Sequence, residues 1–507
     1  MHDTVTRRPP SEASPAGRDA GPWLTVPRLW LVVVLGAIGV MGLSRMPSAV
    51  DLAYHVKAGE LMVAEHTLPR TDALAWTTAG RPWLDQNWGA QLLLYGIWRL
   101  GGFPLLTVVN ALLAVASWGL VAAACRRRTS NLRVIAWAIL VGYATAAATF
   151  SVRPQMFSLL LFAAELYLLE AARARIRIAL AIPLLMPLWA NLHGAFIVGI
   201  GLLAIETLAA AWRRDRPGAV RYLLVTVASV AGLLVNPWGV RVLGYALSVP
   251  ANRVVSGMIS EWGPTNVREL PGVLVLPAVG VLVVALVRAA APQQVPEQLL
   301  RMVLLGGLAF WAVRGVAWFG LALPVALCAL ARPHPARPDA DRGMPVLNGV
   351  VLAALAVALV VATPPAQRVL FAQRSELAAA PVATADWLAA NPQSGRMFNY
   401  QLWGSYLEFR LGPQAQVGFD SRIELPPADR WDRYLAVVAG RWDAERLLDA
   451  WGVDHVVTSR RATPALVRLL EASGRWRLAF SMGDQLVYQR AEGVADVTRP
   501  SLPPQAP

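Results

Sequence analysis

Two side chains suited to acid–base chemistry stand four positions apart, just after the first long apolar run of the sequence. Asp51 and His55 point to the same side if this segment is helical. A carboxylate at a membrane surface could remove a proton from an acceptor hydroxyl, and the His could orient it or share an ion with it. Asp51 could also cap the helix that begins there, because Asp is a favoured N-cap residue. The two interpretations are compatible, and Asp51 and His55 are the catalytic candidates.

The stretch from Asp51 to Gly89 is too polar to cross a bilayer and holds further candidates. Lys57 could contact a substrate. Carboxylates are the ligands that Mg²⁺ and Mn²⁺ prefer, so Asp51, Glu60 and Asp85 are candidates to hold a divalent cation as cofactor. The His residues lack the Cys/His spacing typical of zinc sites.

Two short polar segments interrupt later apolar sequence. Each contains a polar or charged residue that is energetically unfavourable in contact with lipid. Arg153 precedes Pro154 at a helix start, where its guanidinium could clamp a phosphate or extend to lipid headgroups. Asn191 and His193 end another apolar run just before Gly194. This pair could bind a ligand, satisfy the backbone of the hairpin, or do both. Further substrate-binding candidates are Arg241, in the long connection from Asn236 to Arg268, and Arg314.

The elements that must position these residues are membrane helices. Of the 507 residues, 56% are hydrophobic and only 15% are charged, which indicates a polytopic membrane protein. The net charge of +14 comes from arginines, because Lys57 is the only lysine. The arginines form short clusters between apolar runs, a pattern typical of membrane topology and not of nucleic-acid binding.

A transmembrane helix needs about 20 mostly apolar residues, and this criterion predicts about eleven transmembrane helices. They lie near 28–47, 103–125, 132–150, 154–172, 176–192, 194–212, 220–236, 271–288, 299–313, 315–331 and 346–363, and residues 86–100 are predicted to form an interfacial helix. Placing the arginine clusters on the inner side puts the N-terminus inside and the C-terminal region outside. The inner clusters are Arg126 to Arg128, then Arg173, Arg175 and Arg177, then Arg213, Arg214, Arg216 and Arg221, then Arg288 and Arg301, and finally Arg332, Arg337 and Arg342.

The composition changes after the last predicted span, and residues 364–490 indicate an extracytoplasmic α/β domain. Its expected strands are 396–400, 416–419, 453–458, 476–481 and 485–488, and its expected helices are 383–390, 403–410, 429–438, 444–451 and 464–472. Asp420 and Arg422 follow one expected strand and could contact a ligand or form a structural pair that pins the loop. The termini, 1–27 and 491–507, are predicted to be disordered.

The motifs of the first outer region resemble those of the GT-C superfamily of integral membrane glycosyltransferases. They are Asp51-x-x-Tyr-His-x-x-x-Gly-Glu-x-Met62, Leu68-Pro69, Gly80-Arg-Pro-Trp83 and an apolar helix that ends in Arg99-Leu-Gly-Gly102. The nearest branches are the protein O-mannosyltransferases and the lipid A aminoarabinose transferases, and other motifs resemble poorly characterised bacterial members. Many members carry a second acid directly after the first, where this chain has Leu52.

This resemblance implies catalysis by Asp51, a polyprenyl-phosphate-linked sugar as donor, and glycosylation outside the membrane. The leading hypothesis is therefore an inverting membrane glycosyltransferase of the bacterial plasma (inner) membrane, acting in the cell envelope on a glycan, lipid or protein acceptor, with no nucleic-acid partner. The expected division is a transmembrane domain over 28–363, with a first outer loop over 48–102, followed by the outer domain. The alternative is a non-catalytic GT-C-like scaffold or a transporter of lipid-linked glycans. Glu60, Asp72 and Asp85 are reserve candidates for the missing second acid.

Overall fold

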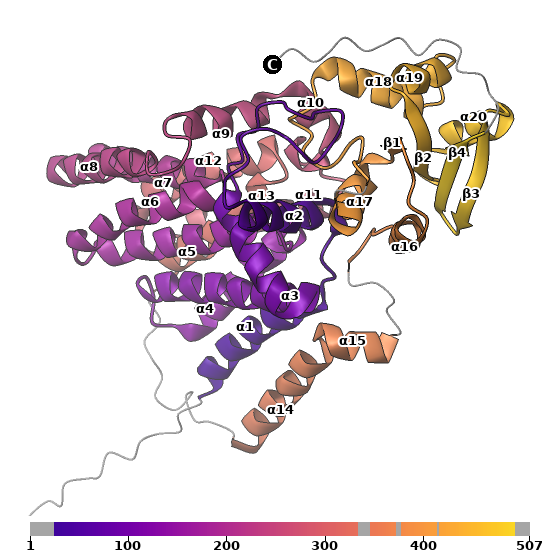
Figure 1. Ribbon diagram of the computed structural model, residues 1–507. Coiled ribbons are helices and arrows are strands. Elements are labelled where there is room, and N and C mark those ends of the chain that lie inside the picture. The colour runs from indigo at the N-terminus through magenta and orange to yellow at the C-terminus, as the bar shows by residue number, and fades with distance from the viewer. Residues whose placement is uncertain (1–24, 333–344, 372–376, 413–414, 492–507) are drawn as a thin grey trace, which may run out of the picture.

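The computed structural model describes residues 25–332, 345–371, 377–412 and 415–491. The predicted disordered tails fall almost entirely outside these ranges. The described chain is mostly helical, with a bundle of apolar helices followed by a small mixed α/β region (Figure 1).

A helix occupies each of the eleven predicted spans. These helices are α1 (Val26–Ser44), α3 (Trp88–Arg126), α4 (Leu132–Ala146), α5 (Gln155–Ala172), α6 (Ile182–Leu192), α7 (Phe196–Trp212), α8 (Arg216–Gly232), α11 (Leu270–Val287), α12 (Val295–Trp311), α13 (Gly315–Leu330) and α14 (Pro345–Val361). Five spans among the described residues are long and apolar enough to cross a membrane, or six if α14 and the bent helix that follows it count as one. The class of multi-pass helical protein is thus confirmed, whereas the number of eleven spans stays a prediction.

The predicted interfacial helix is the first part of α3. The backbone of Gly101 (φ −163°, ψ 23°) and Gly102 (φ 65°, ψ −163°) is not helical, so α3 breaks between this part and the predicted span. Glycine permits the positive φ at the break. The sequence boundary between 86–100 and 103–125 is therefore a real break in the helix.

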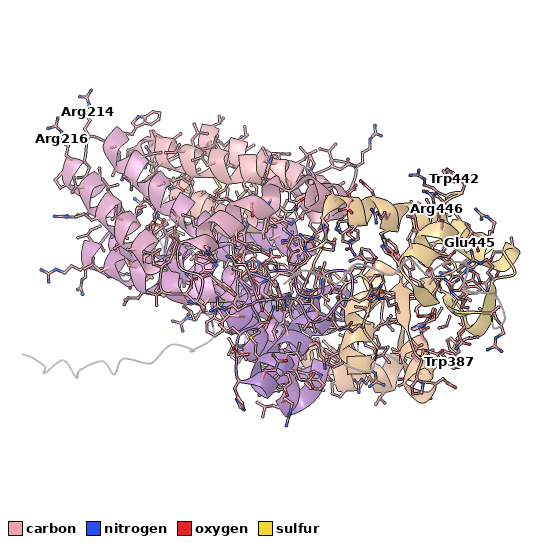
Figure 2. All side chains as sticks on the ribbon, turned by 45° about the horizontal axis from the view of Figure 1, so that its top comes forward. Arg214, Arg216, Trp387, Trp442, Glu445 and Arg446 are labelled. Carbon is pink, nitrogen blue, oxygen red and sulfur yellow. The ribbon has the colours of Figure 1, made fainter. Side chains whose placement is uncertain are left out.

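At one end of the bundle, arginines predicted to lie inside form a buried ion-pair network, the inner cluster. Its members are Arg128, Glu170, Arg173, Glu206, Arg213, Glu297 and Arg301. Arg301 is fully buried and lies 3.1 Å from a carboxylate oxygen of Glu170. Figure 2 places Arg214 and Arg216 at the end of the bundle farthest from Trp442, Glu445 and Arg446 of the C-terminal region.

The C-terminal region contains a four-stranded sheet in the order β1-β2-β4-β3. Strands β1 (Arg396–Asn399) and β2 (Val453–Ser459) are parallel, and β3 (Trp476–Met482) and β4 (Gln485–Arg490) complete an antiparallel arrangement. The accompanying helices are α16 (Val382–Ala390), α17 (Gln401–Leu411), α18 (Ala428–Val438), α19 (Ala444–Ala450) and α20 (Pro464–Ala472). Helix α15 (Pro364–Phe371) is bent by 78° from α14 before this region begins. The predicted domain boundaries stay predictions.

The expected strand at 416–419 was wrong. Val417 forms only an isolated parallel bridge with Ala75, and the Trp76 N–H donates to its carbonyl oxygen at 3.0 Å. The apolar residues Val417 and Phe419 are buried against the first outer loop and the helices of this region. This segment therefore joins the C-terminal region to the loop that carries the predicted catalytic residues.

Three further helices lie in the connections between the helices of the bundle. Helix α2 (Ala49–Glu65) carries Asp51 and packs between α3 and α17. Helices α9 (Arg241–Ala251) and α10 (Arg253–Met258) lie in the long connection after α8. Helix α2 lies at the end of the bundle that meets the C-terminal region (Figure 1).

Candidate functional site

Asp51 lies in the first turn of α2 and does not cap it. The Ser48 hydroxyl is the cap, because it accepts a hydrogen bond from the Val50 N–H at 3.3 Å. The capping interpretation of Asp51 was therefore wrong. Its side chain is 37% exposed, so its carboxylate is accessible to a ligand.

Asp51 belongs to a chain of alternating charges, here called the outer cluster: Asp51, Arg153, Glu261 and Arg314. Arg153 Nη1 lies 3.3 Å from Asp51 Oδ2, and Arg153 Nη2 lies 2.7 Å from Glu261 Oε2. Arg314 Nε contacts the same Glu261 oxygen at 3.0 Å. Four separate segments of the chain thus bring their charged side chains to one place.

A cavity of about 200 Å³ opens beside the outer cluster. Arg153, Glu261 and Arg314 line it, together with Gln155 and Ser260. Although burial opposes ionisation of Glu261, the neighbouring guanidinium groups of Arg153 and Arg314 lower its pKa. The buried Arg153 Nε has no hydrogen-bond partner among the described residues. A buried donor without a partner is unfavourable and marks a group that a ligand could satisfy.

His193 follows α6 and is held as a neutral ring. Its Nδ1 accepts a hydrogen bond from the Ala195 N–H at 3.2 Å and lies 2.9 Å from the Ser158 hydroxyl oxygen. Since Nδ1 is an acceptor, we assign the ring proton to Nε2. Burial, reinforced by the positive charges of Arg314 and Arg153, lowers the pKa of His193 to about 3. The ring can therefore donate a hydrogen bond from Nε2 without carrying charge.

No hydrogen bond or ion pair joins His55 to Asp51 among the described residues, although both lie on one side of α2. Its Nδ1 accepts from Gln91 Nε2 at 3.3 Å, and the same amide donates to Asp85 Oδ1 at 2.9 Å. Burial, with a contribution from the charges of His193 and Arg153, holds the His55 pKa well below its usual value. The structure thus gives His55 no role in orienting the Asp51 carboxylate.

Asp85 is a buried carboxyl in the loop between α2 and α3. Burial raises its pKa to about 7, against the opposing effects of Arg422 and of hydrogen bonds from the Asn87 backbone and the Gln91 amide. Its Oδ2 atom is buried without a hydrogen-bond partner in the described chain. Glu424 contributes negative charge from the C-terminal region.

The three carboxylates proposed for a metal ion have different partners. Asp51 pairs with Arg153, Glu60 with Lys57 at 2.9 Å, and Asp85 accepts from Gln91. Over the described residues, no group of three or more His, Cys, Asp or Glu side chains is arranged to hold a metal. The proposed set of metal ligands therefore does not form a site.

Two of the substrate-binding candidates lie away from the outer cluster. Lys57 is on the side of α2 that faces a different cavity, where its amine pairs with Glu60. Arg241 is exposed at the start of α9, and its side chain makes no ion pair with the outer cluster.

Asn191, Asp420 and Arg422 make structural contacts. The Asn191 amide accepts from Trp88 Nε1 at 2.9 Å and donates to the carbonyl oxygens of Pro187 and Val235, each at 2.7 Å. Arg422 is buried against Asp420 and lies 2.6 Å from Asp72 Oδ1. These observations favour the structural alternatives: Asn191 satisfies the backbone of its hairpin, and Asp420 and Arg422 form a pair that fixes their loop.

Sequence reasoning left Glu261 and Glu424 out of the candidate site. Glu261 is the only acidic residue between Asn236 and Arg268, a signal that could have singled it out. Glu424 accepts a hydrogen bond from the Tyr245 hydroxyl at 3.2 Å. Nothing in the local sequence links Glu424 to the outer loops, because the contact spans two distant parts of the chain.

This arrangement of helices and loops is similar to the folds of two solved membrane glycosyltransferases, as the resemblance to the GT-C superfamily led us to expect. The chain is similar to arabinofuranosyltransferase AftD from mycobacteria, at 15% identity and a TM-score of 0.55, over 93% of this chain and 40% of that one. It thus spans less than half of that protein. It is also similar to the archaeal oligosaccharyltransferase AglB from Archaeoglobus fulgidus, solved with an inhibitory peptide and a dolichol-phosphate, at 9% identity and a TM-score of 0.54, over 94% of this chain and 75% of that one.

The apo form of the A. fulgidus oligosaccharyltransferase gives a similar result, with 11% identity, a TM-score of 0.53, and coverage of 92% of this chain and 75% of that one. No family model and no curated protein sequence matches the chain. At these identities the similarity establishes the fold, and the branch of the superfamily stays a prediction.

Proposed function

We propose that this chain is an inverting membrane glycosyltransferase that moves a sugar from a polyprenyl-phosphate-linked donor to a glycan, lipid or protein acceptor. The fold that it shares with two glycosyltransferases supports this class of reaction. The dolichol-phosphate held in complex by the archaeal oligosaccharyltransferase supports a lipid-linked phosphate as part of the donor.

The observation that carries the proposal is the ion pair between Asp51 and Arg153, which joins a candidate base to a candidate phosphate ligand. In the proposed step, the acceptor hydroxyl oxygen attacks the anomeric carbon of the sugar and its proton passes to Asp51. The bond between the anomeric carbon and the phosphate oxygen breaks, and the lipid phosphate leaves with the electron pair. General-base catalysis of this kind contributes about 10²- to 10⁴-fold to a rate.

The positive side chains of the outer cluster supply what the leaving phosphate needs. Arg153 and Arg314 border the small cavity, and a guanidinium offers a planar fork to phosphate oxygens. The neutral His193 could add a donor from Nε2. Fixed donors aimed at developing charge are worth most in such partly buried sites. Glu261 holds both guanidinium groups, so we assign it a positioning role.

We further propose that the reaction takes place at the outer face of the bacterial inner membrane. The arginine distribution supports an inner location for the end that carries Arg214 and Arg216, opposite the C-terminal region. Arg153 and Arg314 of the outer cluster lie at the other ends of α5 and α12, two of the helices that the inner cluster joins, so the candidate site would face the extracytoplasmic side. On this arrangement the C-terminal region would help to bind or position the acceptor.

The test is the Asp51→Asn variant, which preserves the shape of the side chain and removes its basicity. At equal membrane abundance, we expect transfer from a polyprenyl-phosphate sugar, or complementation of a glycan defect, to fall about 100-fold or more. Asp432→Asn, at an exposed position on α18, is the matched control and should retain activity. Full transfer by the Asp51 variant would refute a catalytic base at this position.

One observation favours the alternative of a non-catalytic scaffold or transporter: the buried Leu52 occupies the place of the second acid. The lipids of a deletion strain distinguish the two. Accumulation of a polyprenyl-phosphate sugar in the outer leaflet supports transfer, whereas its absence from that leaflet supports transport.

A further inference from the structure

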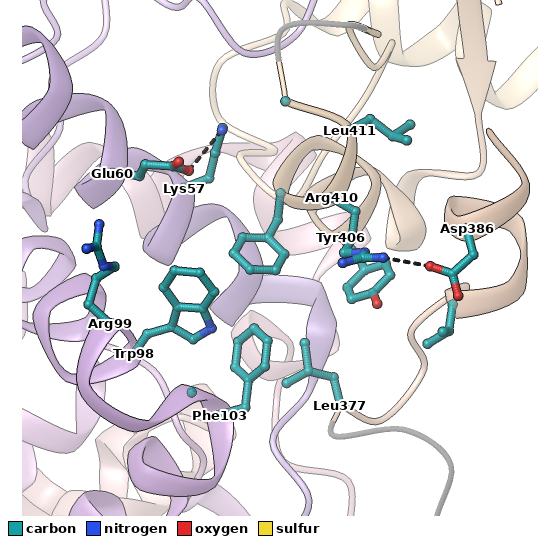
Figure 3. A pocket seen from close by; sticks show the side chains of 14 residues that line it. Lys57, Glu60, Trp98, Arg99, Phe103, Leu377, Asp386, Tyr406, Arg410 and Leu411 are labelled. Atoms are coloured by element: carbon teal, nitrogen blue, oxygen red, sulfur yellow. Dashed lines mark hydrogen bonds and ion pairs between the residues drawn. The ribbon is translucent and has the colours of Figure 1, made fainter. Parts of the chain in front are cut away.

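A second, larger cavity lies on the other side of α2 from Asp51. Its volume is about 860 Å³, and its walls come from α2, the first part of α3, α16 and α17 (Figure 3). Glu60, which lines it, is nine residues beyond Asp51 and so points to the opposite side of the helix at about 100° per residue. This volume falls in the range of about 300–1,000 Å³ of small-molecule sites.

Aromatic rings from distant parts of the chain form one surface of this cavity. The ring centroids of Trp98 and Phe409 are 5.3 Å apart, those of Phe103 and Phe409 are 5.5 Å apart, and those of Trp98 and Phe103 are 6.3 Å apart. Tyr406 extends the surface along α17. Aromatic faces carry partial negative charge, which suits the C–H groups on the apolar face of a sugar ring.

Two ion pairs flank the aromatic surface, one on each side in Figure 3. Lys57 Nζ lies 2.9 Å from Glu60 Oε2, and Arg410 Nη2 lies 2.6 Å from Asp386 Oδ1. The side chains of Glu60, Asp386 and Arg410 are 40%, 55% and 44% exposed, so their donors and acceptors remain within reach of a ligand. Within each pair the charges cancel. Arg99, which also lines the cavity, donates a hydrogen bond to the Tyr95 hydroxyl at 3.1 Å and leaves a single excess positive charge.

Paired charges beside aromatic rings favour one class of ligand. An anionic ligand would require a clear excess of cations. Here Glu60 and Asp386 neutralise Lys57 and Arg410, and the one remaining cation, Arg99, already donates to Tyr95. A hydrocarbon chain would leave the donors and acceptors of both pairs without partners, which costs free energy. A neutral chain of sugars has hydroxyl groups that both donate and accept, and ring faces that can pack on Trp98 and Phe409.

We propose that this cavity is a binding site for a neutral oligosaccharide, separate from the site of transfer. The proposal rests on the proposed function in one respect: the oligosaccharide is the acceptor glycan, whose distal sugars occupy the cavity while its growing end reaches Asp51. Nine residues of α2 separate Asp51 from Glu60, which is about 14 Å along the helix axis. A glycan of several sugars is long enough to span this distance, and on this proposal the cavity selects acceptors by length.

The experiment uses the full chain in lipid nanodiscs and an array of neutral oligosaccharides of different lengths. We expect binding to at least one oligosaccharide, and a loss of tenfold or more in affinity for Trp98→Ala and Phe409→Ala. Trp442→Ala is the matched control, because Trp442 is an 83% exposed tryptophan outside the cavity. Arg410→Gln removes a charge at an exposed position without changing the aromatic surface, and it should also weaken binding. This variant keeps the test valid if Trp98→Ala fails to fold.

Three results would overturn the oligosaccharide site. The first is no binding by the unsubstituted chain, and the second is equal binding by the Trp98 and Trp442 variants. The third is that Trp98→Ala changes nothing except the loss of a co-purified phospholipid, measured by native mass spectrometry. The Asp51→Asn variant distinguishes a failure of this proposal from a failure of the proposed function. The variant should bind the oligosaccharides as the unsubstituted chain does and should lose transfer activity. If it retains transfer, the result contradicts Asp51 as the catalytic base and leaves the binding site untouched.

Discussion

The Asp85 carboxyl has surroundings that oppose its ionisation. It is buried, one of its oxygens has no partner among the described residues, and burial raises its pKa to about 7. An unfolded Asp ionises near pH 4. Between these two values the folded chain binds the proton more tightly than the unfolded chain does, so stability falls as the pH rises from about 4 to about 7. Above this window the full cost of the buried charge is present.

We therefore predict that Asp85→Asn stabilises the protein at pH 8 and has little effect at pH 4. The upper bound follows from a shift of about three pKa units at 1.36 kcal/mol each, which is about 4 kcal/mol. The Asn side chain can still accept from Gln91. Apparent melting temperatures measured in detergent between pH 4 and pH 8 provide the test, with Asp432→Asn as control. Equal pH profiles for Asp85→Asn and the unsubstituted chain would contradict a raised pKa at this position.

Residue types and spacing predicted part of the candidate site. Asp51, Arg153 and Arg314 were placed on one side of the membrane by arginine counting, and the structure brings them together. The spacing of Asp51 and His55 could not predict whether they interact, because helical periodicity shows that two residues share a face of the helix but not that their side chains form a hydrogen bond. Gln91, on another helix, occupies the His55 ring nitrogen instead.

At the scale of elements, the close approach of α2 to α3 positions Asp51 and the Gln91 network. The approach depends on Gly59, where an added Cβ would lie 2.7 Å from the Tyr95 Cβ and closer still to the Gln91 carbonyl oxygen. The nearest of these atoms belongs to backbone, which cannot move aside as a flexible side chain can. A larger residue at this position must push the two helices apart.

Gly59→Val is accordingly expected to destabilise the protein by about 1–3 kcal/mol, the usual cost of overpacking. Gly96→Val is the matched control, since a Cβ at Gly96 would meet nothing within 4 Å. Thermal unfolding in detergent compares the two variants. If both valines change the melting temperature equally, the helix contact at Gly59 does not limit the packing of α2.

Element types were largely predictable, since every apolar segment of adequate length became a helix. The exception at Val417 has a physical explanation. A short apolar run has the composition of a buried strand, but whether it pairs with a strand depends on neighbours, and its neighbour here is Ala75 of the outer loop. Periodicity within four residues contains no information about a partner more than 300 positions away.

At the scale of the whole molecule, the two charge clusters lie at opposite ends of helices α5 and α12. The inner cluster pairs residues that end α3, α5 and α7 with the first turns of α12, and the outer cluster lies near the starts of α2, α5 and α13. Arginine counting predicted the sides of these groups because membrane insertion retains positive loops inside. It could not predict the ion pairs, since it counts positive residues only and says nothing of their partners Glu170, Glu206 and Glu297.

The proposed topology makes the ends of the molecule distinguishable by a reagent that does not cross membranes. Trp442 is exposed in the C-terminal region, and Arg216 is exposed at the far end of the bundle (Figure 2). With an inner N-terminus and an outer C-terminal region, Trp442→Cys reacts with an impermeant maleimide in sealed right-side-out vesicles, whereas Arg216→Cys reacts only after permeabilisation. The native Cys125 and Cys328 are buried, so the unsubstituted chain should give little background. Reaction of Arg216→Cys in sealed vesicles would reverse the orientation and move the outer cluster to the cytoplasmic side, where extracytoplasmic transfer by Asp51 is impossible.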